Sequence, residues 1–173
     1  VRSSAASDVY KRQFLDAGTT VMSLVRQLPN QHYTIVTSGA NIAIELSQRS
    51  RSTVSCVGGQ ISSSTLSLSG PQAEAFLATV NIDTAVLAAT GYSAGAGFTV
   101  GSYTENSLKR RVIQKADKVI LLIDRSKLGR TLPFTFASLS DIDVVICDAP
   151  LPEDFIQAAR AAGTEVLQVQ PAK

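Results

Sequence analysis

The sequence is short of histidine, cysteine and charge, and each shortage excludes a class of function. His32 is the only histidine and no C-x-x-C motif occurs, which argues against a zinc site or a Ser-His-Asp triad. Cys56 and Cys147 are far apart in strand-like runs, so we expect free thiols rather than a disulfide. Charged residues make up 17% of the chain and the net charge is +2, so the composition does not demand nucleic acid as a direct partner.

Long apolar segments are also missing. The longest runs, such as residues 119–123, end after a few residues, whereas a membrane-spanning helix needs about 20, so we expect no membrane partner. The first residues carry no apolar core of the signal-peptide kind, which points to a cytoplasmic location. With 173 residues, of which 45% are hydrophobic, the chain is long enough for one domain and too apolar for disorder.

Residues 1–13 differ from the rest of the chain, because they are polar, small and without periodicity. We interpret them as a leader left by cloning or sequence assembly, whose last residues can extend a first strand at Phe14 and Leu15. Residues 14–170 then form the single predicted domain.

From Phe14 onward, β-branched runs alternate with helical patterns. The predicted strands are Thr34–Thr37, Thr53–Val57, Thr84–Ala88, Val119–Asp124, Val144–Cys147 and Val166–Val169. The predicted helices are Thr20–Gln27, Ala40–Gln48, Gln72–Thr79, Thr104–Ala116 and Glu153–Ala162, the last with Gly163 as its C-cap. The strands are almost continuously apolar, as expected for burial on both faces. The alternation therefore predicts an α/β fold with an open, mainly parallel sheet and flanking helices.

Small polar residues follow four of the predicted strands. At D-A-G-T-T (16–20), Gly18 permits a tight turn, and Thr19 and Thr20 place hydroxyls beside unpaired N–H groups at a helix start. This turn can bind a phosphate, or Thr19 can simply cap the helix. The other strand ends lie at residues 37–41, 57–59 and 89–92. Ligands of open α/β sheets bind outside the carboxyl ends of the strands, so the four ends predict a binding crevice, although such residues are also common in ordinary turns.

Nucleotide-binding signatures are absent. Within Gly91–Gly101 the last glycine lies one residue too far for G-x-G-x-x-G, and no G-x-x-x-x-G-K-[ST] occurs. Both absences argue against nicotinamide and P-loop nucleotides as ligands.

Half of the 16 basic residues fall between positions 109 and 130. They belong either to a solvated surface or to a region that faces an anionic small molecule. Glu105 and Lys109, four residues apart on a predicted helix, are either a solvated pair or pocket residues. Lys127 lies near the carboxyl end of a predicted strand, where it can lean into the crevice.

In their order and spacing, these motifs resemble the C-terminal effector domain of DeoR-type bacterial transcriptional regulators. The resemblance covers residues 14 to about 169 and rests on F-L-D-A-G-T-T (14–20), I-V-T-S (35–38), V-G-G (57–59), L-S-L-S-G-P (66–71), E-N-S-L-K-R (105–110), D-R-S-K-L-G-R (124–130) and L-S-D-I-D-V-V-I-C-D (139–148). It implies a fold similar to ribose-5-phosphate isomerase and the coenzyme A transferases. It also implies a phosphorylated sugar or related metabolite as inducer, and assembly into a homo-oligomer.

Carried over by position, the resemblance assigns to the ligand site Asp16, Gly18, Thr19, Thr20, Thr37, Ser38, Gly58, Gly59, Gly91, Tyr92, Glu105, Lys109 and Lys127. Ser38 stands where an asparagine commonly follows the threonine. Members of the family also carry an N-terminal winged helix-turn-helix, for which this chain has no room. We therefore expect contact with DNA only through that missing domain.

We expect a sensor rather than an enzyme, with no catalytic residue, no cofactor and no metal. Aldose–ketose isomerisation needs a carboxylate base, and Tyr92 and Ser93 stand where the related isomerases place acidic residues. Glu105 remains as a candidate base, so a sugar-phosphate isomerase is the main alternative. A nucleotide- or acyl-binding α/β protein is the other.

Overall fold

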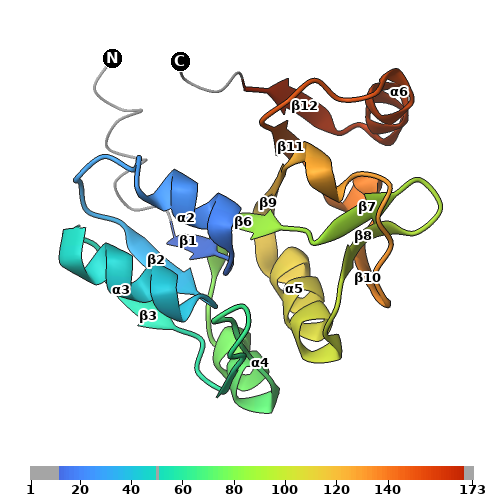
Figure 1. Cartoon of the computed structure of the whole chain (residues 1–173). Helices are drawn as coiled ribbons and strands as arrows, with labels where there is room; N and C mark the ends of the chain where they lie inside the picture. The colour runs from blue at the N-terminus through green and yellow to red at the C-terminus, as the bar shows by residue number, and fades with distance from the viewer. Residues whose placement is uncertain (1–11, 50, 170–173) are drawn as a thin grey trace.

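The computed structural model describes residues 12–49 and 51–169. Its centre is a seven-stranded sheet in which every neighbouring pair of strands is parallel (Figure 1). Across the sheet, the strands follow the order β12 (Glu165–Gln168), β11 (Val144–Cys147), β9 (Ala116–Ile123), β6 (Ile82–Ala88), β1 (Arg12–Leu15), β2 (Thr34–Thr37) and β3 (Thr53–Cys56). The predicted α/β class is confirmed.

Successive strand residues point to opposite faces of the sheet. Because the strands are apolar on both faces, helices cover both. In β1, Leu15 packs with α2 (Thr19–Val25) and α3 (Ala40–Arg49), whereas Phe14 belongs to the core on the other face. That second core includes side chains from three helices, α4 (Pro71–Ala78), α5 (Tyr103–Lys115) and α6 (Glu153–Ala162). The almost continuous apolar character of the strands is thus explained by burial on two sides.

Two small antiparallel sheets complete the fold and were not predicted from the sequence. One has the order β10 (Phe134–Ala137), β8 (Gly97–Val100) and β7 (Gly91–Ser93), and the other pairs β4 (Gln60–Ile61) with β5 (Leu68–Ser69). The glycine-rich stretch 91–101 therefore forms a β-hairpin. Phe98 and Phe136 of the first small sheet belong to the same core as α5.

The predicted elements occur with small shifts of their ends. The last predicted helix has the predicted bounds, and Gly163 caps it in the left-handed conformation. β6 and β9 begin earlier than predicted, at Ile82 and Ala116. β1 begins at Arg12, inside the predicted leader, of which residues 1–11 lie outside the described part of the chain. Assignment of residues 1–13 to a leader stays a prediction.

Two further expectations concern thiols and membranes. Cys56 and Cys147 are free thiols, as predicted. In the described ranges, no helix combines the length and the apolar character that crossing a membrane requires.

Candidate ligand-binding site

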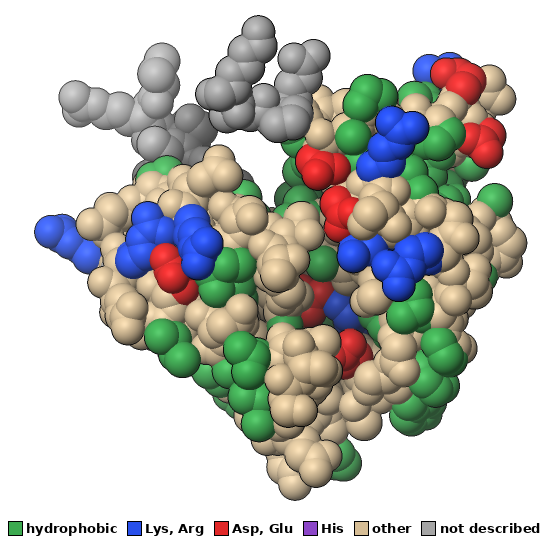
Figure 2. Space-filling view, viewed as in Figure 1, with side chains coloured by type: hydrophobic (Ala, Val, Ile, Leu, Met, Phe, Trp, Pro, Cys, Tyr) green, Lys and Arg blue, Asp and Glu red, His purple; other side chains and the backbone are tan. Residues whose placement is uncertain are grey.

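A pocket of about 370 Å³ opens at the carboxyl ends of β1 and β6. From β1 the chain continues to β2 on one side, and from β6 it continues towards β9 on the other. Two neighbouring strands whose connections diverge in this way leave a crevice beyond their carboxyl ends, where open α/β sheets bind ligands. Figure 2 shows this hollow near the centre of the face, with acidic and basic side chains at its floor. Its volume falls in the usual range for small-molecule sites, about 300–1,000 Å³.

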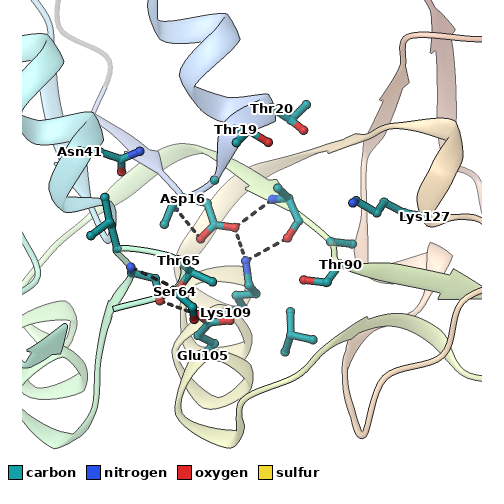
Figure 3. A pocket seen from close by; sticks show the side chains of 17 residues that line it. Asp16, Thr19, Thr20, Asn41, Ser64, Thr65, Thr90, Glu105, Lys109 and Lys127 are labelled. Carbon is teal, nitrogen blue, oxygen red and sulfur yellow. Dashed lines mark hydrogen bonds and ion pairs between the residues drawn. The ribbon is translucent and has the colours of Figure 1, made fainter. Parts of the chain in front are cut away.

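Asp16, the first residue after β1, is held by a dense set of donors at the bottom of the pocket. Its Oδ1 accepts hydrogen bonds from the Ala17 N–H (2.9 Å) and the Ser38 hydroxyl (3.3 Å). Its Oδ2 accepts from the Ala88 N–H (2.9 Å) and from the Lys109 ammonium (Figure 3). Lys109 also donates to the Ala88 carbonyl (2.9 Å), and the Asp16 and Lys109 side chains are 6% and 8% exposed. This buried ion pair joins β1, β6 and α5, and its two charges compensate each other.

The turn after Asp16 brings two hydroxyl groups to the pocket wall. Gly18 has φ 125°, a backbone conformation that favours glycine, and α2 begins at the next residue without a side-chain cap at Gly18. Thr19 and Thr20 both line the pocket. The first N–H groups of a helix have no partner within the helix. The turn therefore offers hydroxyl and N–H donors to a ligand.

Glu105, in the first turn of α5, forms another wall together with a serine- and threonine-rich segment. We call this segment, residues 62–67, the Ser/Thr loop. Glu105 Oε1 accepts hydrogen bonds from the hydroxyls of Thr65 (3.1 Å) and Ser67. Leu66 between them has φ 55°, and its carbonyl accepts a hydrogen bond from the Ala40 N–H at the start of α3 (3.0 Å). The loop is thus tied to helices on both sides of the pocket.

Lys127 approaches the pocket from residues 124–132, which we call the Lys127 loop. Its ammonium lies 3.8 Å from the Asp124 carboxylate, and its side chain is 29% exposed. Asp124 also accepts a hydrogen bond from the Ser126 N–H (2.9 Å), which shapes a short 3₁₀ turn, η1 (Arg125–Lys127). The Gly129 N–H donates to the Tyr92 carbonyl (2.8 Å) and anchors the loop on β7. This contact with β7, a strand distant in sequence, therefore helps to fix the position of Lys127.

Gly91 and Tyr92, both predicted as ligand contacts, lie outside the pocket lining and contact the Lys127 loop. A Cβ on Gly91 would stand 2.5 Å from the Arg130 carbonyl oxygen, so only glycine permits this close approach. The Tyr92 ring is buried against Phe98 and Phe155, with ring centroids 4.8 Å apart in both pairs. Burial raises the pKa of the Tyr92 phenol.

Four more predicted residues also lie outside the pocket lining. Thr37 donates a hydrogen bond to the Leu15 carbonyl (2.7 Å) and so ties the ends of β2 and β1 together. Ser38 supports the pocket indirectly, through its hydrogen bond to the Asp16 carboxylate. Gly58 and Gly59 connect β3 to the β4–β5 hairpin, whose tip is the Ser/Thr loop.

The structure thus divides the predicted ligand residues into two groups. Those that line the pocket are Asp16, Gly18, Thr19, Thr20, Glu105, Lys109 and Lys127. Those that lie outside the lining are Thr37, Ser38, Gly58, Gly59, Gly91 and Tyr92. Contact of any of them with a ligand stays a prediction.

Sequence reasoning missed several lining residues. Ser64, Thr65, Leu66, Ser67, Ala88 and Val100 lie outside the predicted strand ends, whereas Ala17, Asn41, Ala89 and Thr90 fall within them but were not assigned to the ligand site. The abundance of serine in residues 62–69 indicated a loop but not its position. Asn41 carried no signal of its own, because polar residues are frequent near helix starts.

The ionisable side chains of the pocket leave two charges outside the buried pair. With Asp16 and Lys109 compensated, the Glu105 carboxylate and the Lys127 ammonium remain, on different walls, and Lys127 is balanced by a long ion pair to Asp124, which lies outside the lining (Figure 3). Such a pocket favours a ligand with an anionic group near Lys127 and hydrogen-bond donors near Glu105. Within the described ranges, no group of histidine, cysteine and acidic residues is arranged to hold a metal ion.

Comparison with known proteins gives a consistent set of relatives. The family described as the DeoR C terminal sensor domain matches residues 6–149. The HTH-type transcriptional regulator GlpR of Haloferax volcanii is 36% identical over 155 residues, which is 89% of this chain and 60% of the relative. The HTH-type transcriptional repressor GlcR of Bacillus subtilis is 31% identical over 156 residues, 90% of this chain and 60% of the relative. The HTH-type transcriptional regulator IolR of the same organism is 30% identical over 145 residues, 83% and 58%.

The chain therefore spans about three fifths of the length of these curated relatives. The relatives are named as transcriptional regulators, and the matched family is one of sensor domains rather than of enzymes.

Proposed function

Because the chain belongs to the family of DeoR C-terminal sensor domains, we propose that it is the effector-binding part of a transcriptional repressor that senses a phosphorylated sugar or a related metabolite. The names of the relatives support the regulatory role. Contact with DNA falls in this proposal to a part of the regulator other than this domain. Assembly into a homo-oligomer belongs to the proposal as well.

The observation that carries the ligand class is a lysine whose ion pair with Asp124 is long, in the same pocket as two threonines. The Lys127 ammonium and the Asp124 carboxylate form an ion pair 3.8 Å long, beyond hydrogen-bond distance, so Lys127 keeps donors for a ligand in the pocket that it lines with Thr19 and Thr20. A phosphate needs several donors and at least one compensating positive charge. The hydroxyls and N–H groups of the turn supply the donors, and Lys127 supplies the charge.

Lys109 is the less suitable partner for a phosphate, although it lines the same pocket. Its ammonium already donates to the Asp16 carboxylate and to the Ala88 carbonyl. A phosphate could recruit Lys109 only by competing with a buried carboxylate, which would then lose its counter-charge. In this proposal Lys109 shapes the floor of the pocket and Lys127 binds the anion.

The Glu105 side of the pocket suits the hydroxyl groups of a sugar. A carboxylate has about four acceptor positions, and Thr65 and Ser67 both donate to Oε1. The remaining positions can accept hydrogen bonds from ligand hydroxyls. The same carboxylate repels a phosphate, which assigns the two ends of the ligand to different walls.

Calorimetric titration and thermal denaturation with ribose 5-phosphate, hexose 6-phosphates and the free sugars test the proposal. A phosphate ester at 100 times its dissociation constant should stabilise the domain by about 2.7 kcal/mol. At 2–4 °C per kcal/mol, this raises the melting temperature by roughly 5–11 °C. The free sugars should bind far more weakly.

Three variants separate the anion site from general effects. Thr19→Val keeps the side-chain shape but removes a hydroxyl, and it should weaken the phosphate ester by about 1–3 kcal/mol. Lys127→Met should weaken it by a similar amount, whereas Lys118→Met, at an exposed position of β9, should leave the affinity unchanged. Equal binding of a sugar and its phosphate ester, or an unchanged ratio between them in Thr19→Val and Lys127→Met, contradicts the proposal.

A further inference from the structure

Asn41, the second residue of α3, has an amide oxygen that is buried and without a partner. Across residues 12–49 and 51–169, the buried side-chain atoms that lack a hydrogen-bond partner are Asn41 Oδ1 and Asn106 Nδ2. Asn41 is part of the pocket lining, and Asn106 is not. Leaving a buried polar atom unpaired destabilises a fold, so each such atom in a native protein calls for an explanation.

The Ser64 and Thr65 hydroxyls, which line the same pocket, do not share this property. The Thr65 hydroxyl donates to Glu105, and the Ser64 hydroxyl is 3.1 Å from the Ser62 hydroxyl. Unlike these two hydroxyls, the Asn41 amide oxygen has no partner inside the described part of the protein. An amide presents an oxygen acceptor and an NH₂ donor, and rotation by 180° exchanges the two at little change in shape. Because Oδ1 itself is buried, a ligand reaches the amide through its other polar atom, and the 180° rotation decides whether that atom donates or accepts.

The position of Asn41 relative to the two pocket charges indicates which part of a ligand it meets. In Figure 3, Asn41 lies at the left of the pocket, and Lys127 enters from the opposite side. A phosphate beside Lys127 would leave the rest of the molecule to extend towards Asn41. A neutral amide suits an uncharged polar group there, because it offers hydrogen bonds without a net charge.

We propose that Asn41 is a specificity-determining residue, which hydrogen-bonds a hydroxyl group of the ligand at the end of the pocket opposite Lys127. This inference rests on the proposed function and deepens it, since it makes the ligand a phosphate ester with a hydroxyl group distant from its phosphate. Small phosphates without that hydroxyl leave the amide unpaired and bind more weakly. A site rejects a ligand that leaves one of its buried donors or acceptors unpaired more strongly than a ligand that only lacks an apolar contact.

The test compares Asn41→Leu with the parent, using inorganic phosphate and a set of sugar phosphates as calorimetric probes. Leucine is close to asparagine in shape and removes an unpaired polar atom, so the variant should fold as stably as the parent. Inorganic phosphate reports on the Lys127 end alone, and its affinity should not change. The affinity of the best-bound sugar phosphate should fall about tenfold, the equivalent of one hydrogen bond. Its preference over the matching deoxy sugar phosphate should shrink accordingly.

Asn106→Leu is the matched control, because Asn106 also carries a buried unpaired amide atom but lies outside the pocket lining. It should leave the affinity for every probe unchanged. If Asn41→Leu keeps the full preference for sugar phosphates, or if Asn106→Leu loses it equally, the role of Asn41 is refuted while the proposed function stands. If neither inorganic phosphate nor any sugar phosphate binds the parent, the proposed function itself fails, and this inference fails with it.

Discussion

Lys109→Met should be strongly destabilising, because it leaves a buried carboxylate without its counter-charge. Methionine keeps most of the length and apolar stem of lysine but cannot donate to Asp16 or to the Ala88 carbonyl. Asp16 would retain the hydrogen bonds from the Ala17 and Ala88 N–H groups and from Ser38. These dipoles compensate part of a charge but do not replace an ammonium.

The magnitude follows from the burial of the pair. The Asp16 and Lys109 side chains are 6% and 8% exposed, so solvent screens the interaction little. Removing one partner of a buried ion pair costs about 3–5 kcal/mol. For a domain of this size, that corresponds to a fall in melting temperature of roughly 6–20 °C. Since native domains are stable by only about 5–15 kcal/mol, the variant should still fold but with little reserve.

Urea denaturation of the parent and three variants measures the effect. Lys118→Met makes the same chemical change at an exposed position of β9 and should change stability by less than about 0.5 kcal/mol. The double variant Asp16→Asn, Lys109→Met should be more stable than Lys109→Met alone, because it removes the uncompensated charge. A loss no larger in Lys109→Met than in Lys118→Met, or no recovery in the double variant, would refute the assignment of a stabilising buried pair.

Three further predictions concern the core and the thiols. Gly91→Ala places a Cβ 2.5 Å from a backbone oxygen of the Lys127 loop and should lower the free energy of unfolding by about 1–3 kcal/mol, as measured by thermal denaturation. A Cβ on Gly95 meets no atom within 4 Å, so the control Gly95→Ala should leave the stability nearly unchanged. Burial raises the pKa of the Cys147 thiol, so at neutral pH a thiol reagent should modify exposed Cys56 and reach Cys147 only on unfolding; rapid modification of both in the native protein would contradict this. Burial also raises the pKa of the Tyr92 phenol above its ordinary value of 10.0, so the folded state holds this proton more tightly than the unfolded state. The corresponding stability is complete below pH 10 and is lost as pH rises through the folded-state pKa, so Tyr92→Phe should lose less stability than the parent in urea titrations at alkaline pH.

The parallel sheet and its helices could be predicted because their signals are local. Continuous apolar runs mark strands buried on two sides, and a start such as Glu153 with a stop at Gly163 delimits a helix. The three-stranded sheet gave no such signal. Its strands have three or four residues, and β8 pairs with β10 more than 30 residues further along. Nothing within Gly91–Gly101 indicates that partner, so the stretch was compared with nucleotide loops instead.

The candidate site was predictable in its residue types but not in its contacts. Asp16, Thr19 and Lys127 were selected because they follow strands. The partner of Asp16 is Lys109, which lies 93 residues further along, and only the fold brings them together. The alternative between a solvated Glu105–Lys109 pair and pocket residues was settled in favour of the pocket lining by the tertiary structure. Helix periodicity alone cannot distinguish the two.

The site draws its walls from both sides of the central sheet, and this arrangement bears on how a sensor of this kind can respond. Thr19 and Asn41 belong to the helices α2 and α3 on one face, whereas Glu105 and Lys109 belong to α5 on the other. The Asp16–Lys109 pair already joins the two layers at the floor of the pocket. A molecule that contacts Thr19 and Lys127 together adds a second connection above it. A ligand shifts a conformational equilibrium only by the difference between its affinities for the two states. The states that such a ligand can separate are therefore those in which the start of α2 and the Lys127 loop lie at different distances from each other.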